Sequence, residues 1–189
     1  MKKLLFIAVL ILGFSVTAMA QDEFPRGEVF LGYAYFGCDN TVFGSSLKQN
    51  CTYDGWDFSI VLNGTKNLSF VTDFGGYYNR DKPLPGYMDH YHAYTFLFGP
   101  RFTVRQINKV TPFVQALFGD ARVTPGRLGW PYENVFAMAL GGGLDIKVYK
   151  NLSFRPIQLE YMPIKLGKPY SDNIRYNIGI SYSFGSVSR

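Results

Sequence analysis

The alternation of apolar and polar residues along the chain is most regular near its C-terminal end, between Ile174 and Phe184. The residues of one parity are all apolar, namely Ile174, Tyr176, Ile178, Ile180, Tyr182 and Phe184. The residues of the other parity are polar or small, namely Arg175, Asn177, Gly179, Ser181 and Ser183. Because successive side chains of a strand point to opposite faces, the segment predicts a β-strand with one apolar and one polar face. Its length suits a tilted strand that crosses a bilayer, with its apolar face toward lipid and its polar face toward a lumen.

Similar segments recur along the chain, and turn signals separate them. The expected strands cover residues 27–36, 55–63, 68–78, 91–105, 110–123, 134–148, 152–162 and 174–184. Their connections alternate between short turns, such as Asn63–Asn67 and Tyr149–Asn151, and long loops, such as 37–54 and 79–90. Short turns at one end and long loops at the other are typical of outer-membrane barrels. The pattern predicts an all-β fold, an eight-stranded antiparallel up-and-down transmembrane β-barrel with both termini at the periplasmic end.

The first twenty residues follow a different pattern. Lys2 and Lys3 precede the apolar run Leu4–Val16, and Ala18-Met19-Ala20 has the small residues of a cleavage site. This arrangement predicts a secretory signal peptide over residues 1–20, cleaved after Ala20, because the run is short for a spanning helix. The barrel domain is then expected over residues 21–189.

Composition agrees with a membrane barrel rather than a soluble one. Charged residues make up 17% of the chain, against about 25% in ordinary soluble domains. Aromatic residues also make up 17%, and tyrosine and tryptophan collect near the expected strand ends, among them Trp56, Tyr77 and Tyr94. Amphipathic rings prefer the membrane interface, so these residues predict aromatic belts. Without the two signal lysines the chain is only mildly basic, which gives no support for a nucleic-acid partner.

Several charged residues fall on the polar, inward face of the expected strands. They are Glu28, Asp57, Asp73, Arg101, Asp145, Lys147, Arg155, Glu160 and Arg175. A bulge near Pro156 would place Arg155 and Glu160 on the same side. Isolated charges in a narrow interior are unfavourable, and eight strands leave a lumen just wide enough for side chains. We therefore expect an ion-pair network that fills the barrel, with a proton relay, a small-ion path or an acid/base site as the alternatives.

The two cysteines, Cys38 and Cys51, both lie in the first long loop. An exported protein meets an oxidising environment, so we expect a disulfide between them, which would stabilise the fold by about 3 kcal/mol. The alternative is two free thiols.

Candidate chemistry outside the lumen is sparse. His90 and His92 form the only histidine cluster, and a metal site there would need further ligands such as Asp89. No nucleophile–base pair is visible in the sequence. We therefore expect no enzymatic activity, no metal site and no cofactor.

The signal peptide, Gly32-Tyr33-Ala34 in the first strand and the closing run Ile174–Phe184 together resemble the eight-stranded outer-membrane β-barrel superfamily. That group includes the transmembrane domain of outer-membrane protein A, the outer-membrane protein X and Ail adhesion barrels, and the opacity proteins. The resemblance implies a bacterial outer-membrane location and contact with outer-membrane lipid and lipopolysaccharide. It also implies that the barrel-assembly machinery reads Tyr182 and Phe184, although Gly185–Arg189 follow here and the family commonly ends on the aromatic residue.

The resemblance points to a structural or surface-interaction role, such as adhesion, in which the external loops contact a ligand that the sequence does not identify. The alternatives are a narrow porin-like channel for small solutes or ions, a lipid A-modifying enzyme, and a periplasmic lipocalin-like carrier. A carrier would need apolar residues inside the barrel and charges outside.

Overall fold

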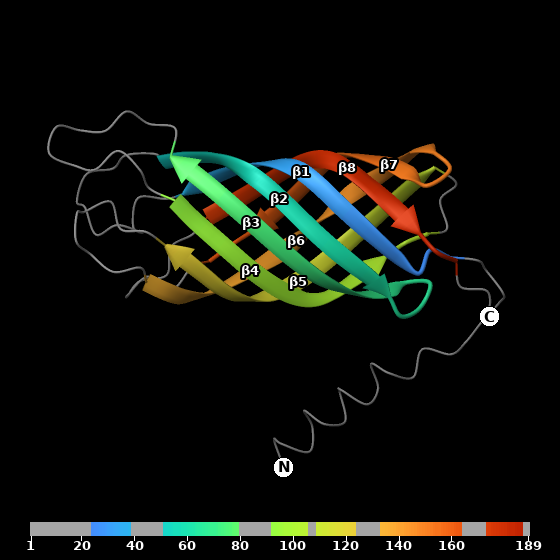
Figure 1. Ribbon diagram of the computed structural model, residues 1–189, viewed down its shortest axis with the longest axis horizontal. Helices are drawn as coiled ribbons and strands as arrows, with labels where there is room; N and C mark the ends of the chain where they lie inside the picture. Colours follow the sequence, from blue (N-terminus) through green and yellow to red (C-terminus); the bar gives the residue numbers. More distant parts are fainter. Residues whose placement is uncertain are drawn as a thin grey trace, which may run out of the picture.

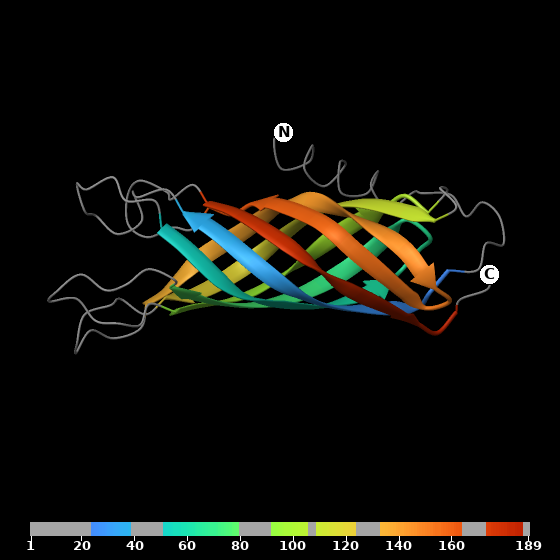
Figure 2. The ribbon, with the colours of Figure 1, turned by 90° about the horizontal axis from the view of Figure 1, so that it is seen from above.

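The computed structural model describes residues 24–38, 51–79, 92–105, 109–123, 133–163 and 173–186. The strands are β1 Gly27–Cys38, β2 Cys51–Asn63, β3 Leu68–Asn79, β4 His92–Thr103, β5 Val110–Val123, β6 Glu133–Tyr149, β7 Leu152–Tyr161 and β8 Asn173–Phe184. Each strand pairs antiparallel with its neighbours in sequence, and β1 pairs with β8 to close the barrel (Figures 1 and 2). The predicted all-β, eight-stranded antiparallel barrel is thereby confirmed. The described residues include no helix long and apolar enough to cross a membrane.

The strands at the loop end extend further than the sequence pattern indicated. β1 and β2 remain in register up to Cys38 opposite Cys51, so the expected loop 37–54 loses residues at both of its ends. Backbone pairing continues here past the point where the apolar–polar alternation fades. At the other end β4 stops at Thr103, two residues before the expected boundary.

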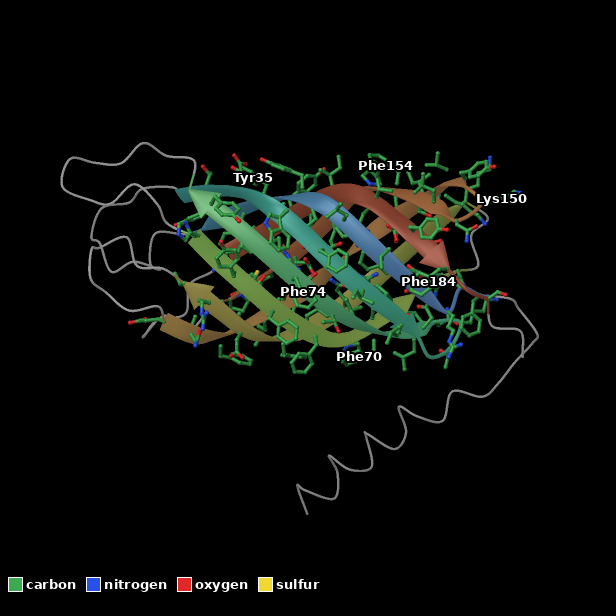
Figure 3. The ribbon with its side chains drawn as sticks, viewed as in Figure 1. Tyr35, Phe70, Phe74, Lys150, Phe154 and Phe184 are labelled. Atoms are coloured by element: carbon green, nitrogen blue, oxygen red, sulfur yellow. The ribbon has the colours of Figure 1, made fainter. Side chains whose placement is uncertain are left out.

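The two faces of the wall differ as the alternation predicts. Large apolar side chains are exposed on the outer face all around the barrel, including Leu31, Phe70, Phe102, Ile180 and Tyr182. Figure 3 shows Tyr35, Phe70 and Phe154 projecting away from the strands. On β2 to β4 the outer rings contact each other across strands, with Phe74 and Phe96 at 5.0 Å between centroids. Paired aromatic side chains stabilise adjacent strands.

The inner face has an apolar region and a polar region. Phe36, Tyr53, Leu97 and Val123 are buried together toward the loop end. Tyr77 belongs to this cluster: it is 1% exposed, and its ring lies 5.1 Å from that of Phe36. Its assignment to an outer aromatic belt is therefore wrong, because it shares the parity of the inward-facing Asp73.

The register shifts on β7 at Pro156, where the sequence predicted a bulge. Arg155 lies opposite Gly179 and Gln158 opposite Asn177, so β7 has one residue more than β8 over this stretch. The Tyr176 hydroxyl donates a hydrogen bond of 2.7 Å to the Pro156 carbonyl. The bulge restores the parity that turns Arg155 and Glu160 inward.

Candidate functional site in the barrel lumen

Eight of the nine charged residues predicted to face the lumen are buried inside the barrel. Their side chains come from seven strands, every strand except β5. None has a relative exposure above 8%: Glu28, Asp57, Asp73, Arg101, Asp145, Arg155, Glu160 and Arg175. Burial of this many charges without solvent requires partners within the interior. The structure supplies them in two groups, one in the middle of the lumen and one at the turn end.

Arg175 on β8 is the centre of the larger group. Its Nη1 lies 2.8 Å from Asp73 Oδ1 and 3.1 Å from Asp57 Oδ2, and it donates to the Tyr77 hydroxyl at 2.9 Å. Its Nε and Nη2 lie 2.7 and 2.6 Å from Glu160 Oε2. One guanidinium thus joins β2, β3, β7 and β8 across the lumen. Planar arginine with several donors suits such a position better than lysine.

Neutral amides extend this group to the opposite wall. Gln115 donates to Glu160 at 2.6 Å and accepts from Arg101 Nε at 2.7 Å. Gln158 donates to Glu160 at 2.9 Å and accepts from Arg155 Nη1 at 2.7 Å. Arg155 in turn forms two hydrogen bonds with the carboxylate of Asp145, at 2.7 and 2.9 Å. Seven of the eight buried charges, all except Glu28, therefore belong to one connected network.

Two aromatic rings enclose the Arg155 guanidinium. Its Cζ lies 4.1 Å from the ring centroid of Phe30 and 4.5 Å from that of Phe113. These rings come from β1 and β5, which are half a turn apart in the closed strand order. A cation between two ring faces is favourable, and more so when it is desolvated.

Glycines on the barrel wall make room for both rings. A Cβ at Gly32 would meet the Phe30 ring at 2.5 Å, and a Cβ at Gly143 would meet the Phe113 ring at 2.7 Å. The side chains of Phe30, Arg155 and Phe113 therefore follow one another in contact across the lumen, and Gly32 and Gly143 lie beside the two rings. Close-packed side chains of this kind leave little room for a water path at this level.

The second group closes the turn end of the lumen. Glu28 forms an ion pair with Arg105, and Asn63 donates to Glu28 at 3.0 Å. Ser69 donates to Asn63 at 2.5 Å, and Arg105 also donates to the Lys66 carbonyl at 2.8 Å. These contacts tie the start of β1 to the β2–β3 turn and to the residues after β4.

Lys147 is the exception among the predicted lumen charges, because its side chain is exposed. It lies near the turn end of β6, where the register shifts between Lys147 and Tyr149. An ammonium group without a buried counter-charge is more stable in solvent. The expectation that it joins the lumen network is therefore wrong.

Sequence reasoning left several members of the networks out of the candidate site. They are Asn63, Tyr77, Arg105, Gln115, Gln158 and Asn177. Their parity in the strands marked most of them as inward-facing, so the signal was present. Arg105 lies beyond the end of β4, and the other five residues are neutral, because a buried network needs amides and hydroxyls as well as charges to complete its hydrogen bonds.

The other candidate residues lie on the outer face or outside the described residues. Tyr182 and Phe184 are exposed near the turn end. His92 contacts the rings of Tyr78 and Tyr94 on the outer face near the loop end, and His90 is outside the described residues. Among the residues that the structure describes, no group of His, Cys, Asp or Glu is arranged to hold a metal ion.

These features define a closed eight-stranded antiparallel barrel with an apolar outer surface and a charged, side-chain-filled interior, the fold of small outer-membrane barrels. No family model and no curated protein matches the sequence. Among solved structures, the chain is similar to Neisserial surface protein A, with 16% identity, a TM-score of 0.66, and coverage of 87% of this chain and 100% of that one.

Two other barrels are similar in fold at comparable identity. The attachment invasion locus protein Ail of Yersinia pestis has 19% identity and a TM-score of 0.53, with coverage of 87% of this chain and 100% of that one. The outer membrane protein OprG of Pseudomonas aeruginosa has 11% identity and a TM-score of 0.58, with coverage of 85% and 97%. At these identities the comparisons establish the fold, and they confirm the resemblance that the sequence indicated.

Proposed function

We propose that the chain is an integral outer-membrane protein whose barrel anchors external loops that contact ligands or other surfaces. The observation that carries this proposal is the arrangement of the two faces. Large apolar side chains are exposed around the outside, while eight charged residues are buried inside. This is the distribution of a barrel whose outer surface faces lipid. A lipocalin-like carrier would have the opposite arrangement, with an apolar interior for its ligand.

The filled lumen favours an anchor over a channel. The stack of Phe30, Arg155 and Phe113 spans the interior, and the Arg175 network joins four strands beside it. The activity is then expected at the loops, which are outside the described residues. One similar barrel, Ail, carries attachment and invasion in its name and was solved with a heparin analogue. That observation motivates a surface-contact role here, with lipopolysaccharide and outer-membrane lipid as the immediate neighbours and no enzymatic activity.

The first test is whether the protein is a sealed barrel in the outer membrane. We expect it in the outer-membrane fraction, with a band that migrates faster before heating than after, since a folded barrel resists detergent. In planar bilayers we expect no steady single-channel conductance. The matched variants for the conductance measurement are Phe30→Ala, which removes one ring from the stack of Phe30, Arg155 and Phe113, and Phe74→Ala, which removes a ring from the outer face.

Three outcomes would contradict parts of this proposal. Recovery with soluble periplasmic proteins would remove the membrane placement. Steady conductance of the native protein would instead make it a narrow channel. Cleavage of labelled lipid A by the purified barrel would assign an enzymatic activity.

The predicted disulfide belongs to the same proposal. Cys38 and Cys51 are directly opposite each other in the register of β1 and β2, which places their backbones at the separation of paired strands. We expect the native protein to lack titratable thiols until it is reduced. Reduction should lower the free energy of unfolding by about 3 kcal/mol. Alkylation of both thiols in the unreduced, unfolded protein would show that no bridge forms.

A further inference from the structure

The two ends of the barrel differ in the sign of their exposed charges. At the turn end, the exposed side chains of Arg26, Lys109, Lys147 and Lys150 are all basic. Lys66 and Arg105 are half-buried at the same end. The described acids nearest this end are Glu28 and Asp145, which face the lumen and are paired with Arg105 and Arg155. At the loop end, the described outer charges are mixed: Asp54, Asp120 and Glu133 with Arg122.

The four exposed cations, which we call the basic rim, are distributed around the barrel. Arg26 lies where β1 begins, between the ends of β2 and β8, because its backbone bonds with Asn63 and Gly185. Lys109 precedes β5, and its carbonyl accepts from the Lys147 amide of β6 at 2.8 Å. Lys150 lies in the β6–β7 turn, and Figure 3 shows it at the end of the barrel. The exposed cations are therefore distributed over several strands around the turn end of the barrel.

The basic rim borders the apolar outer surface directly. Val148 and Tyr149, which are 65% and 68% exposed, lie between Lys147 and Lys150 in the sequence. Tyr182 and Phe184 of β8 are exposed near the same end. Aromatic rings at the edge of an apolar band mark the level of the lipid headgroups. Long basic side chains at that level place their charged ends among the headgroups.

We propose that the basic rim binds anionic phospholipid headgroups of the leaflet on the turn side of the barrel. This inference rests on the proposed membrane placement. Juxtamembrane lysine and arginine attract anionic lipid, and the effect of one such cation corresponds to roughly a fivefold change in association. The occupant is a lipid rather than a protein or polymer, because Lys147 and Lys150 flank Val148 and Tyr149, which are exposed at the edge of the apolar outer surface. The test therefore compares two lipids that differ in the charge of their headgroups.

The experiment measures lipid selectivity of the native barrel in phosphatidylcholine vesicles. Trace spin-labelled phosphatidylglycerol or phosphatidylcholine is added, and electron paramagnetic resonance separates lipid at the protein surface from bulk lipid. We expect the anionic label to associate several-fold more strongly, and about 0.5 M salt to remove most of this preference. The variant Lys109→Gln/Lys150→Gln should lower this several-fold preference toward equal association of the two labels, since each cation contributes at most roughly fivefold.

The control variant is Arg122→Glu at the loop end, which changes the net charge by the same amount as the paired glutamine substitutions. It should keep the native preference for the anionic label. Equal association of both labels with the native barrel, or an equal loss in the control, would overturn the basic-rim proposal alone. Failure of the native barrel to enter vesicles, seen as the absence of a heat-modifiable band, would instead overturn the membrane placement on which it rests.

Discussion

Arg175→Met is expected to lower the free energy of unfolding of the barrel by at least about 3–5 kcal/mol, the usual effect of removing one partner from a buried ion pair. Arg175 is fully buried and lies within 3.1 Å of a carboxylate oxygen of each of Asp57, Asp73 and Glu160. Methionine fills a similar volume but leaves three carboxylates without their shared cation. Urea unfolding of the detergent-solubilised barrel, followed by the heat-modifiable band, measures the change.

Two further variants separate charge from packing. Arg175→Lys keeps the charge but has no planar fork, so one ammonium group cannot reproduce the contacts to both Asp73 and Glu160, and an intermediate loss is expected. In the double variant Arg175→Met/Asp57→Asn, one uncompensated carboxylate is gone, so part of the stability should return.

The surface control is Arg122→Met. This residue is exposed and bonds with Asn134 on the outer face, so its replacement should change stability by no more than about 0.5 kcal/mol. Similar unfolding midpoints for the Arg175 and Arg122 variants would show that the lumen network does not stabilise the barrel.

The sequence pattern was sufficient for the fold because a single alternation decides both the strand and its faces. Ile180 and Tyr182 are exposed on the outside, while Arg175 and Asn177 are fully buried inside, as their parity requires. Eight such strands with alternating short and long connections leave few arrangements besides a closed up-and-down barrel. The bulge at Pro156 was predictable for the same reason, since only an extra residue keeps both Arg155 and Glu160 inside.

The partners within the lumen were not predictable from that pattern. Parity places Arg175 inside but does not say which charges lie at its level, because the level depends on the register of every strand around the closed barrel. Arg175 is opposite Glu160 in the β7–β8 register but reaches Asp73, which is on a strand that does not pair with β8. The enclosure of Arg155 by Phe30 and Phe113 joins residues of three separate strands and has no local signal in the sequence.

The environments of side chains near the strand ends were also not predictable from the alternation alone. Near the turn end an inward-facing position is close to solvent, so Lys147 is exposed although its parity matches that of Asp145. Near the loop end the interior is apolar, so the tyrosine ring of Tyr77 is stable inside and its hydroxyl bonds with Arg175. Parity predicts the side of the wall, whereas depth along the barrel decides the environment.

Gly141→Ala is expected to destabilise the barrel by about 3 kcal/mol or more, because an added methyl group has no space on the inner face of β6. A Cβ at Gly141 would lie 2.0 Å from the Leu159 carbonyl oxygen and 2.8 Å from Glu160 Cγ. Relief requires β6 and β7 to separate, which moves Glu160 away from Arg175 and Gln115 and weakens the network at its most connected carboxylate. Urea unfolding and the temperature at which the fast-migrating band disappears measure the effect.

Gly37→Ala is the matched control for this prediction, since it makes the same chemical change within another strand of the barrel. A Cβ at Gly37 would have the Ile174 carbonyl oxygen as its nearest neighbour, at 3.9 Å, which is ordinary van der Waals contact. The loss of glycine also reduces the freedom of the unfolded chain, so this variant should be neutral or slightly more stable than the native protein. Coincident unfolding curves for the two variants would mean that β6 and β7 accommodate the methyl group, and the close approach of these strands would then not limit the stability of the barrel.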